Sequence, residues 1–586
     1  MSLASRHPRP LRTAVGAALC AVVVIGVAPF RADAHPAIPA TTTTVAVIPA
    51  PAHLEVHADE AAALGPRTVI KIHSRDNGAR KVGSQFAQFL RTATGYRIPV
   101  GTADGDDHHS DSRARGATVE LSTRGGAALG QEGYALNVKK NRVSIEAHTA
   151  EGLFRGVTTL RQLLPRQIES ATQAEGPWTV PAVRISDTPR YGYRGAMLDV
   201  ARRFFDVADV KRFIDHMAMY KLNALHLHLT DDQGWRLTVD ERPALTQVGA
   251  STQSGWKPGT GGPWYYTKAQ YREIVEYAAN RFIDVIPEID GPGHATAAKA
   301  SLPEVNCDGQ AVPPYSGFDV GLPPVCLAPE ARPAVKAYLT DVLQEASRQS
   351  SADIVHIGGD EVPSITTEQM DWYVRSAGEV VTGEGKRVMG WHQIGAGTLP
   401  SGSLLQWWGD HGDQASIGTD RETGGVRDLR AGVAQGAQVI ASPADRAYLD
   451  MKYDSTNPYG LSWAGLVNLR RAYEWDPISV TSSPDGAHRI VSEQQVAGVE
   501  AALWSDRAYR GSSSLPTSLD QFVPPSVYAD FMTYPRLPAI AEVGWSPGAV
   551  RSYDDFQRRV VAHGQRWDLR GIGYYRAPDV PWVTAS

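Results

Sequence analysis

Short apolar runs, most of them ending in a polar or aromatic side chain, recur along the C-terminal two-thirds of the chain. Eight such runs follow one another, separated by segments of helix length: RGAMLDVAR, NALHLHLTDD, FIDVIPEID, DIVHIGGDE, RVMGWHQ, LLQWWGD, QVIASPAD and VAGVEAALWSD. Strands that are buried on both faces have this continuous apolar character, and alternation of strands with helices favours parallel pairing. The pattern therefore predicts an α/β fold, a (β/α)8 TIM barrel with enlarged loops, over residues 188–586.

Residues 53–187 show a different pattern. VGSQFAQFL and TAEGLFRGVTTLRQLLP place apolar residues at helical spacing, whereas YALNV and RVSIEA alternate on either side of a short polar turn. The alternating pair is typical of a β-hairpin. We predict a small α+β domain here, and it contains no recognisable catalytic constellation.

The N-terminus has the three parts of a secretion signal. MSLASRHPRPLRT is basic, AVGAALCAVVVIGVAPF is apolar, and Ala32-Asp33-Ala34 offers a small-residue cleavage site. We expect a signal peptide over residues 1–34, cleaved after Ala34, and a secreted protein. An uncleaved membrane anchor is the alternative, although the apolar run is short for a membrane span. Residues 35–52 are rich in Pro, Thr and Ala, and are predicted to form a linker or an extended segment leading into the small domain.

Charge and apolar content argue against nucleic acid and membranes as partners. The formal net charge is −5, and no long basic run follows the N-terminus, so nucleic acid is not an expected partner. No second stretch is apolar enough to cross a bilayer, so no membrane partner is expected after cleavage.

Cleavage would remove Cys20 and leave Cys307 and Cys326, which predict one disulfide in an exported chain; two free buried thiols are the alternative. The oligomeric state does not follow from the sequence.

Chemistry in a TIM barrel lies at the C-terminal ends of the strands. Several tryptophans occur at or after these predicted ends, beside carboxylates and without a glycine-rich phosphate loop. An indole ring can stack on the apolar face of a pyranose, while acids and arginine bind its hydroxyls. A sugar is therefore the expected ligand.

The adjacent acids Asp360 and Glu361 limit the mechanism. Glycosidases usually place two acids on either side of the scissile bond, and neighbours on a strand would point to opposite faces. An adjacent pair suits a reaction in which one acid acts on the leaving oxygen and the other holds a nucleophile that belongs to the substrate. A C2 acetamido group can attack C1 in this way. Glu361 is then the predicted acid/base, and Asp360 orients the acetamide and stabilises its developing charge.

Six motifs in this order, HLHLTDDQGWR, VIPEIDGPGH, HIGGDE, LQWWG, YLDMKY and GLSWAG, resemble the family 20 glycoside hydrolases, the β-N-acetylhexosaminidases. The resemblance covers essentially the whole mature chain, including the small domain before the barrel. It implies a retaining exo-enzyme that removes terminal GlcNAc or GalNAc from oligosaccharides or glycoconjugates, such as chitin fragments. It further implies an oxazolinium intermediate, with no metal and no cofactor.

The resemblance assigns roles residue by residue. Tyr448 matches the hydroxyl that bonds the acetamide carbonyl, and Asp231 and His294 match a buried pair that supports the acid/base. The implied catalytic set is Glu361, Asp360, Asp231, His294 and Tyr448. The implied substrate-binding set is Arg202 for the 3- and 4-hydroxyls, Asp450 for the outer hydroxyls, Trp391, Trp408 and Trp504 as walls around the acetamido methyl and the ring, and Trp463 and Asp506.

Two departures from the family pattern leave alternatives open. The last strand ends in LWSD rather than LWTE, so Asp506 is one methylene shorter than the usual glutamate, and ARR replaces SRH around Arg203. The sugar preference and a disaccharide-releasing family 20 enzyme therefore remain open. A metal-dependent hydrolase using His226 and His228 is a further alternative, with other ligands among His294, His356 and Asp360. A non-catalytic carbohydrate-binding protein would keep the tryptophans but would not need the paired acids.

Overall fold

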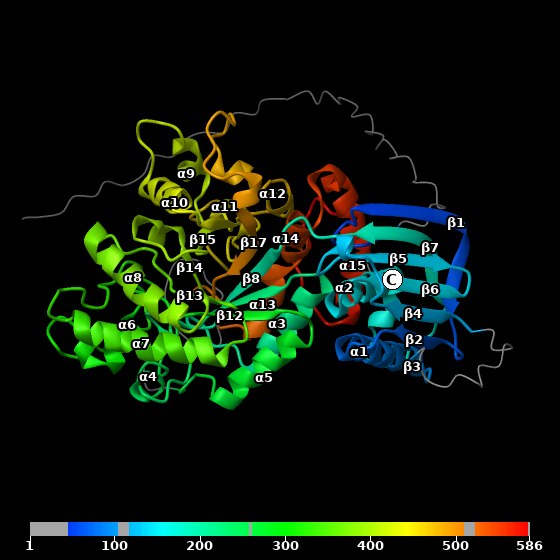
Figure 1. Cartoon of the computed structure of the whole chain (residues 1–586), viewed down its shortest axis with the longest axis horizontal. Helices are drawn as coiled ribbons and strands as arrows, with labels where there is room; N and C mark the ends of the chain where they lie inside the picture. The colour runs from blue at the N-terminus through cyan, green and yellow to red at the C-terminus, as the bar shows by residue number, and fades with distance from the viewer. Residues whose placement is uncertain (1–44, 103–115, 257–260, 509–521, 584–586) are drawn as a thin grey trace, which may run out of the picture. The chain divides into compact units, whose positions relative to one another are not determined.

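The computed structural model describes residues 45–102, 116–256, 261–508 and 522–583 (Figure 1). The predicted signal peptide and residues 35–44 of the segment that follows it lie outside the described residues. No helix in the described part of the chain is long and apolar enough to cross a membrane.

A seven-stranded mixed sheet precedes the barrel. Its strand order is β1-β7-β5-β6-β4-β2-β3, and β5 and β6 form the predicted hairpin. Two helices, α1 (Asn77–Thr94) and α2 (Ala150–Leu163), pack their apolar faces on the sheet to form one core. The strands are β1 (His53–Leu64), β2 (Val69–His73), β3 (Val100–Thr102), β4 (Thr118–Ser122), β5 (Tyr134–Lys139), β6 (Arg142–Ala147) and β7 (Trp178–Asp187).

Eight parallel strands then close into a barrel in the order β8-β9-β12-β13-β14-β15-β16-β17. Each of the eight apolar runs contains one of these strands, so the predicted TIM barrel is confirmed. The strands are β8 (Tyr193–Asp199), β9 (Ala224–His228), β12 (Asp284–Glu288), β13 (Ile354–His356), β14 (Arg387–Trp391), β15 (Leu404–Trp407), β16 (Gln438–Ala441) and β17 (Val496–Leu503). A small ribbon, β10 (Thr230–Asp231) and β11 (Gly234–Trp235), follows β9.

The long helices of the barrel pack against its strands or against one another, as α5 does on β12 and α8 on β14. They are α3 (Val207–Met219), α5 (Lys268–Ala279), α7 (Arg332–Gln349), α8 (Thr367–Gly383), α10 (Gly424–Ala434), α14 (Arg536–Trp545) and α15 (Tyr553–Leu569). Shorter helices are α4 (Ala244–Gln247), α6 (Thr296–Ser301), α9 (His411–Ser416), α11 (Ala444–Ala447), α12 (Leu469–Tyr473) and α13 (Pro525–Thr533).

Residues 45–52 are a packed segment rather than a free linker. Ile48 is fully buried, and its backbone N–H donates to the Gln162 side chain at 2.8 Å. The N–H of Ala50 donates to Glu542 on α14 at 2.8 Å, and Arg559 on α15 donates to the carbonyl of Val47 at 3.0 Å. Because these backbone groups are satisfied by distant parts of the chain, the segment is part of the core.

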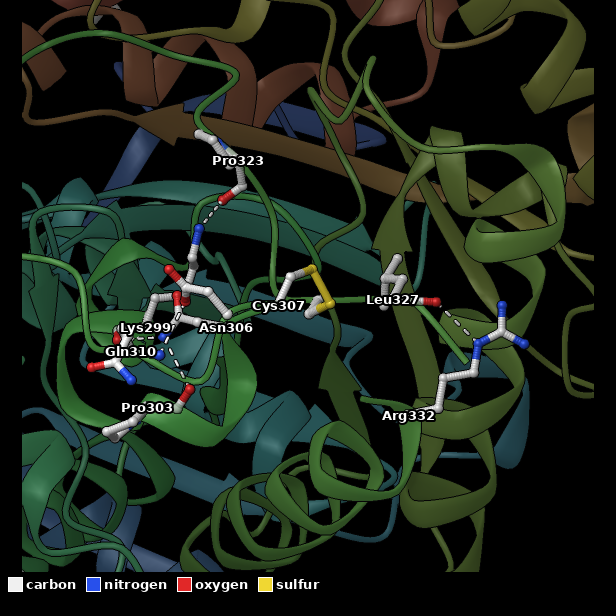
Figure 2. The surroundings of a disulfide bond; sticks show 10 residues. Lys299, Pro303, Asn306, Cys307, Gln310, Pro323, Leu327 and Arg332 are labelled. Atoms are coloured by element: carbon white, nitrogen blue, oxygen red, sulfur yellow. Dashed lines mark hydrogen bonds between the residues drawn. A yellow bond between two sulfur atoms is a disulfide. The ribbon is translucent and has the colours of Figure 1, made fainter. Parts of the chain in front are cut away.

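The predicted disulfide is present: Cys307 and Cys326 are bonded, with Cα atoms 5.0 Å apart (Figure 2). The bond closes a long loop between α6 and α7 that has no helix or strand of its own beyond a short 3-10 turn. Two hydrogen bonds support the base of this loop. The Cys326 N–H donates to the Val305 carbonyl at 2.8 Å, and Lys299 Nζ donates to the Pro323 carbonyl at 2.7 Å (Figure 2).

We expect the double substitution Cys307→Ser, Cys326→Ser to lower the free energy of unfolding by about 3 kcal/mol, because the open loop has more freedom in the unfolded chain. Urea unfolding of the two proteins measures the difference. Reductant supplies the matched control, since it should destabilise the wild type and leave the double variant unchanged. Equal unfolding midpoints for oxidised wild type and variant would contradict the expectation.

Candidate active site

A pocket opens at the carboxyl ends of the barrel strands, with a volume of about 530 Å³ including its mouth. This volume suits a small ligand such as one sugar ring. Ten of the twelve predicted site residues line it together: Arg202, His294, Asp360, Glu361, Trp408, Tyr448, Asp450, Trp463, Trp504 and Asp506. Val320 and Leu461 complete the lining, and neither was predicted from the sequence.

A glycine turn brings both neighbouring acids to the pocket. Strand β13 ends at His356, so Asp360 and Glu361 lie beyond it and do not follow the alternation of a strand. Gly358 has a φ of +69°, and a Cβ there would lie 1.7 Å from Asp290 Oδ1. Glu361 itself has a φ of +50°, which is strained for a residue with a side chain. Because the turn ends the alternation of the strand, both adjacent acids can line one pocket.

The expected Asp–His pair lies beside the predicted acid/base. His294 Nε2 is 3.3 Å from Glu361 Oε2, and His294 Nδ1 is 3.3 Å from Asp231 Oδ1. Burial opposes protonation of His294, but the carboxylates of Asp231 and Asp360 outweigh it and raise its pKa well above the ordinary value. Asp231 is fully buried behind the pocket lining, and its other oxygen lies 2.6 Å from Arg202. One carboxylate thus contacts both the pocket arginine and the histidine.

Asp360 is a desolvated carboxyl group with an oxygen to spare. It is 8% exposed, and its Oδ1 has no hydrogen-bond partner among the residues that the structure describes. Burial raises the pKa of Asp360 to about 7, with Glu361 adding to the effect and His294 opposing it. An unpartnered buried oxygen of this kind is suited to accept an N–H from a ligand.

Aromatic rings form the walls of the pocket. Tyr448 packs 6.1 Å from Trp504 and 6.0 Å from Trp463, measured between ring centroids. Trp463 is 52% exposed. Trp391 differs from the expectation: it is fully buried behind Trp504, at a centroid distance of 5.6 Å, and lies outside the pocket lining. Its indole N–H donates to Glu288 at 2.9 Å, and this bond holds the ring in the barrel interior.

Asp450, Asp506 and Arg202 add further polar atoms to the pocket lining. Both carboxylate oxygens of Asp450 are buried without a partner in the described part of the chain, and burial, reinforced by Asp506, raises its pKa well above the ordinary value. Asp506 lies 3.9 Å from Arg202 Nε. Arg202 packs over Trp504 at 4.9 Å from the ring centroid. Unpartnered oxygens beside an arginine suit a ligand that is rich in hydroxyl groups.

Three buried residues near the site were not predicted as part of it: His228, Glu288 and Asp290. Burial, followed by the nearby Asp360, raises the pKa of Asp290 well above the ordinary value. Glu288 and His228 belong to hydrogen bonds that lead from Asp231 into the barrel. A charged residue within an otherwise apolar run, as in VIPEID, was the signal that could have identified Glu288.

Several of these side chains are close enough to hold a metal ion, including the groups His226–Glu288–His356 and His228–Asp231–Asp290. All are buried, and neither His226 nor His228 lines the pocket. Their ring nitrogens already contact carboxylates, with His226 Nδ1 2.9 Å from Glu500 and His228 Nε2 2.7 Å from Asp231. The H-x-H pair is thus packed as a hydrogen-bonded element of the barrel core.

A parallel barrel with a pocket of this size at its strand ends, aromatic walls and an acid backed by an Asp–His pair defines a barrel glycoside hydrolase. Comparison with known families specifies which one. Residues 191–548 match the catalytic domain of glycosyl hydrolase family 20, and residues 44–188 match domain 2 of the same family. The chain therefore belongs to glycosyl hydrolase family 20.

Individual relatives agree with this assignment. The chain is 37% identical to a β-N-acetylhexosaminidase of Cellulomonas fimi over 92% of its own length and 97% of that protein. A Streptomyces plicatus N-acetyl-β-hexosaminidase in complex with thio-NAglucal has a TM-score of 0.81 at 41% identity, over 92% of this chain and 98% of that one. The family 20 β-N-acetylhexosaminidase of Streptomyces coelicolor A3(2) has a TM-score of 0.80 at 41% identity, over 92% and 99% of the two chains.

The raised pKa of Asp360 predicts that its ionised carboxylate lowers the free energy of unfolding. An aspartate has a pKa of 3.8 when unperturbed and about 7 here, so the cost is fully present above pH 7 and vanishes below about pH 4. We expect Asp360→Asn to increase the free energy of unfolding at pH 8 by about 1 to 2 kcal/mol, and the gain to shrink as the pH falls.

Urea unfolding at pH 8 and pH 5 measures this gain. Asp420→Asn is the matched control, because Asp420 is exposed and should show no such dependence on pH. An Asp360→Asn variant that is no more stable than the wild type at pH 8 would show that the ionised carboxylate of Asp360 does not destabilise the fold.

Proposed function

We propose that the protein is a retaining exo-β-N-acetylhexosaminidase that removes terminal GlcNAc or GalNAc with the help of the substrate's own acetamido group. The observation that carries this proposal is the pair of neighbouring acids. Glu361 stands beside His294, whereas Asp360 is buried with a free oxygen. The two acids therefore have different tasks, as a reaction with a nucleophile on the substrate requires.

In the first step, Glu361 gives its proton to the glycosidic oxygen while the acetamide carbonyl oxygen bonds to C1. The C1–oxygen bond to the leaving group breaks, and an oxazolinium ion forms. Asp360 accepts the acetamide N–H and stabilises the positive charge, and a carboxylate with a pKa near 7 accepts a proton more readily than an ordinary aspartate. The hydroxyl of Tyr448, at the pocket wall, donates to the former carbonyl oxygen.

In the second step, Glu361 takes a proton from water, and the water oxygen bonds to C1. The C1–oxygen bond of the oxazolinium ion breaks and restores the acetamide, so the configuration at C1 is retained. His294 lies 3.3 Å from Glu361 and stabilises it when it is a carboxylate, between the two proton transfers. Arg202, Asp450 and Asp506 hold the hydroxyls of the ring during both steps.

Chitin fragments are the substrate class that the relatives favour. Two of them are named N,N'-diacetylchitobiase, from Vibrio harveyi, and chitooligosaccharidolytic β-N-acetylglucosaminidase, from Bombyx mori.

The test is the rate of nitrophenol release from the β-glycosides of GlcNAc and of glucose, which differ only in the C2 acetamide. We expect the GlcNAc substrate to react faster by roughly a hundredfold or more, because an intramolecular nucleophile replaces a bimolecular one. Comparable rates would mean that an enzyme carboxylate attacks C1, and the roles of Asp360 and Glu361 would have to be exchanged for others.

We also propose that the protein is secreted after cleavage following Ala34. The basic and apolar N-terminal pattern supports this, and so does the disulfide, since such bonds persist in oxidising compartments. Edman sequencing of protein recovered from the culture medium should begin at His35. Protein that stays in the cell membrane with its N-terminus intact would instead indicate an anchor.

A further inference from the structure

Buried hydrogen bonds continue from the Asp–His pair into the centre of the barrel. Asp231 Oδ2 lies 2.7 Å from His228 Nε2, and His228 Nδ1 lies 2.5 Å from Glu288 Oε2. The side chains of all three residues have no exposed surface. The carboxylate at the C-terminal end of β12 is therefore joined through one imidazole to the carboxylate that contacts Arg202 and His294.

Carboxylates at both ring nitrogens favour the imidazolium form of His228, although Arg202 Nη1 also lies 3.4 Å from Nε2. A neutral imidazole has one N–H, whereas two carboxylates, one on each ring nitrogen, require two. Burial disfavours the charge, but Glu288 and Asp231 outweigh it and raise the pKa of His228 well above the ordinary value. Asp231 thus receives a charged hydrogen bond that depends on Glu288.

Glu288 also holds the pocket wall. Its Oε1 accepts the indole N–H of Trp391 at 2.9 Å, and Trp391 packs behind Trp504. Two further imidazoles surround the same carboxylate: His226 Nε2 at 3.0 Å and His356 Nδ1 at 2.9 Å. Glu288 is therefore a common partner of His228, on the side of the acid, and of Trp391, on the aromatic side, although it does not line the pocket.

We propose that Glu288 is a positioning residue for the reaction: it fixes His228 against Asp231, and thereby His294 and Glu361, and it fixes Trp391 behind the wall of the pocket. The proposal rests on the proposed function, since it concerns the proton that Glu361 transfers. Glutamine at this position keeps the shape of the side chain but has only one acceptor oxygen. Its amide N–H groups would face ring N–H groups, so His228 must lose a proton or turn, and Asp231 loses a charged partner.

The test is Glu288→Gln, assayed on aryl β-GlcNAc glycosides with a series of leaving groups and on chitobiose. We expect kcat on chitobiose to fall by about tenfold to a hundredfold, the range typical of supporting hydrogen-bond partners. The loss on nitrophenyl glycosides should be smaller, because a good leaving group needs less help from the acid. Glu361→Gln supplies the reference pattern of steep dependence on the leaving group.

Two matched variants separate positioning from simple core damage. Glu500→Gln removes another buried partner of His226 but contacts neither Asp231 nor Trp391, and it should keep the leaving-group dependence of the wild type. Trp391→Phe removes the indole donor without touching His228, and it should change KM more than the leaving-group dependence. A folded Glu288→Gln enzyme with wild-type kcat and wild-type leaving-group dependence would overturn the proposal.

A measurement on the wild type covers the case in which the variant does not fold. In protein labelled with [¹⁵N]histidine, NMR at pH 8 should show His228 with protons on both ring nitrogens, assigned by comparison with His228→Gln. A neutral His228 at this pH would also overturn the proposal. Failure of the proposed function would appear differently, as absent activity of the wild type itself on β-GlcNAc glycosides.

Discussion

The buried carboxylate of Asp231 links the sugar-binding side of the site to the side that carries the acid. Its two oxygens meet Arg202, on the sugar-binding side, and His294, on the side of the acid, while His228 approaches from the barrel core. Taking a carboxylate out of water is costly unless several donors surround it, and here three cationic or imidazole side chains do so. The positions of these three donors therefore depend on one another. As a result, the sugar-binding Arg202 and the His294 that supports Glu361 keep a fixed geometry relative to each other.

The pocket itself carries the opposite kind of electrostatics. Asp360 and Asp450 are buried with oxygens that no described residue satisfies, and their pKa values are raised as a result. A protein that folded only for stability would pair or remove them. The closed barrel tolerates this cost because its strands are fixed on all sides by parallel neighbours and by the helices around them. Beneath the pocket, Asp231 is held by its donors, whereas the unpartnered oxygens of Asp360 and Asp450 within the pocket are available to a ligand.

The sequence alone predicted the barrel, because strands buried on both faces leave continuous apolar runs. Acids and tryptophans at the strand ends indicated a sugar site there, whereas most of the ten lining residues were assigned through the resemblance of the six motifs to family 20. It could not show that Trp391 lies behind Trp504, since a position at a strand end does not say which layer a ring occupies. His228 and Glu288 were obscure because a buried charge in a strand can indicate packing, a metal or catalysis. Val320 was missed because it lies in the disulfide-closed loop, which has no periodic pattern.

The packed segment at residues 45–52 has a consequence for synthesis. Ala50 finds its partner Glu542 after an interval of 492 residues, and Val47 is bonded by Arg559 on the last helix. The first described residues of the fold thus wait for almost the whole polypeptide to leave the ribosome before they can dock. Native packing is completed late, and a chain truncated before α14 lacks the groups that satisfy its own beginning.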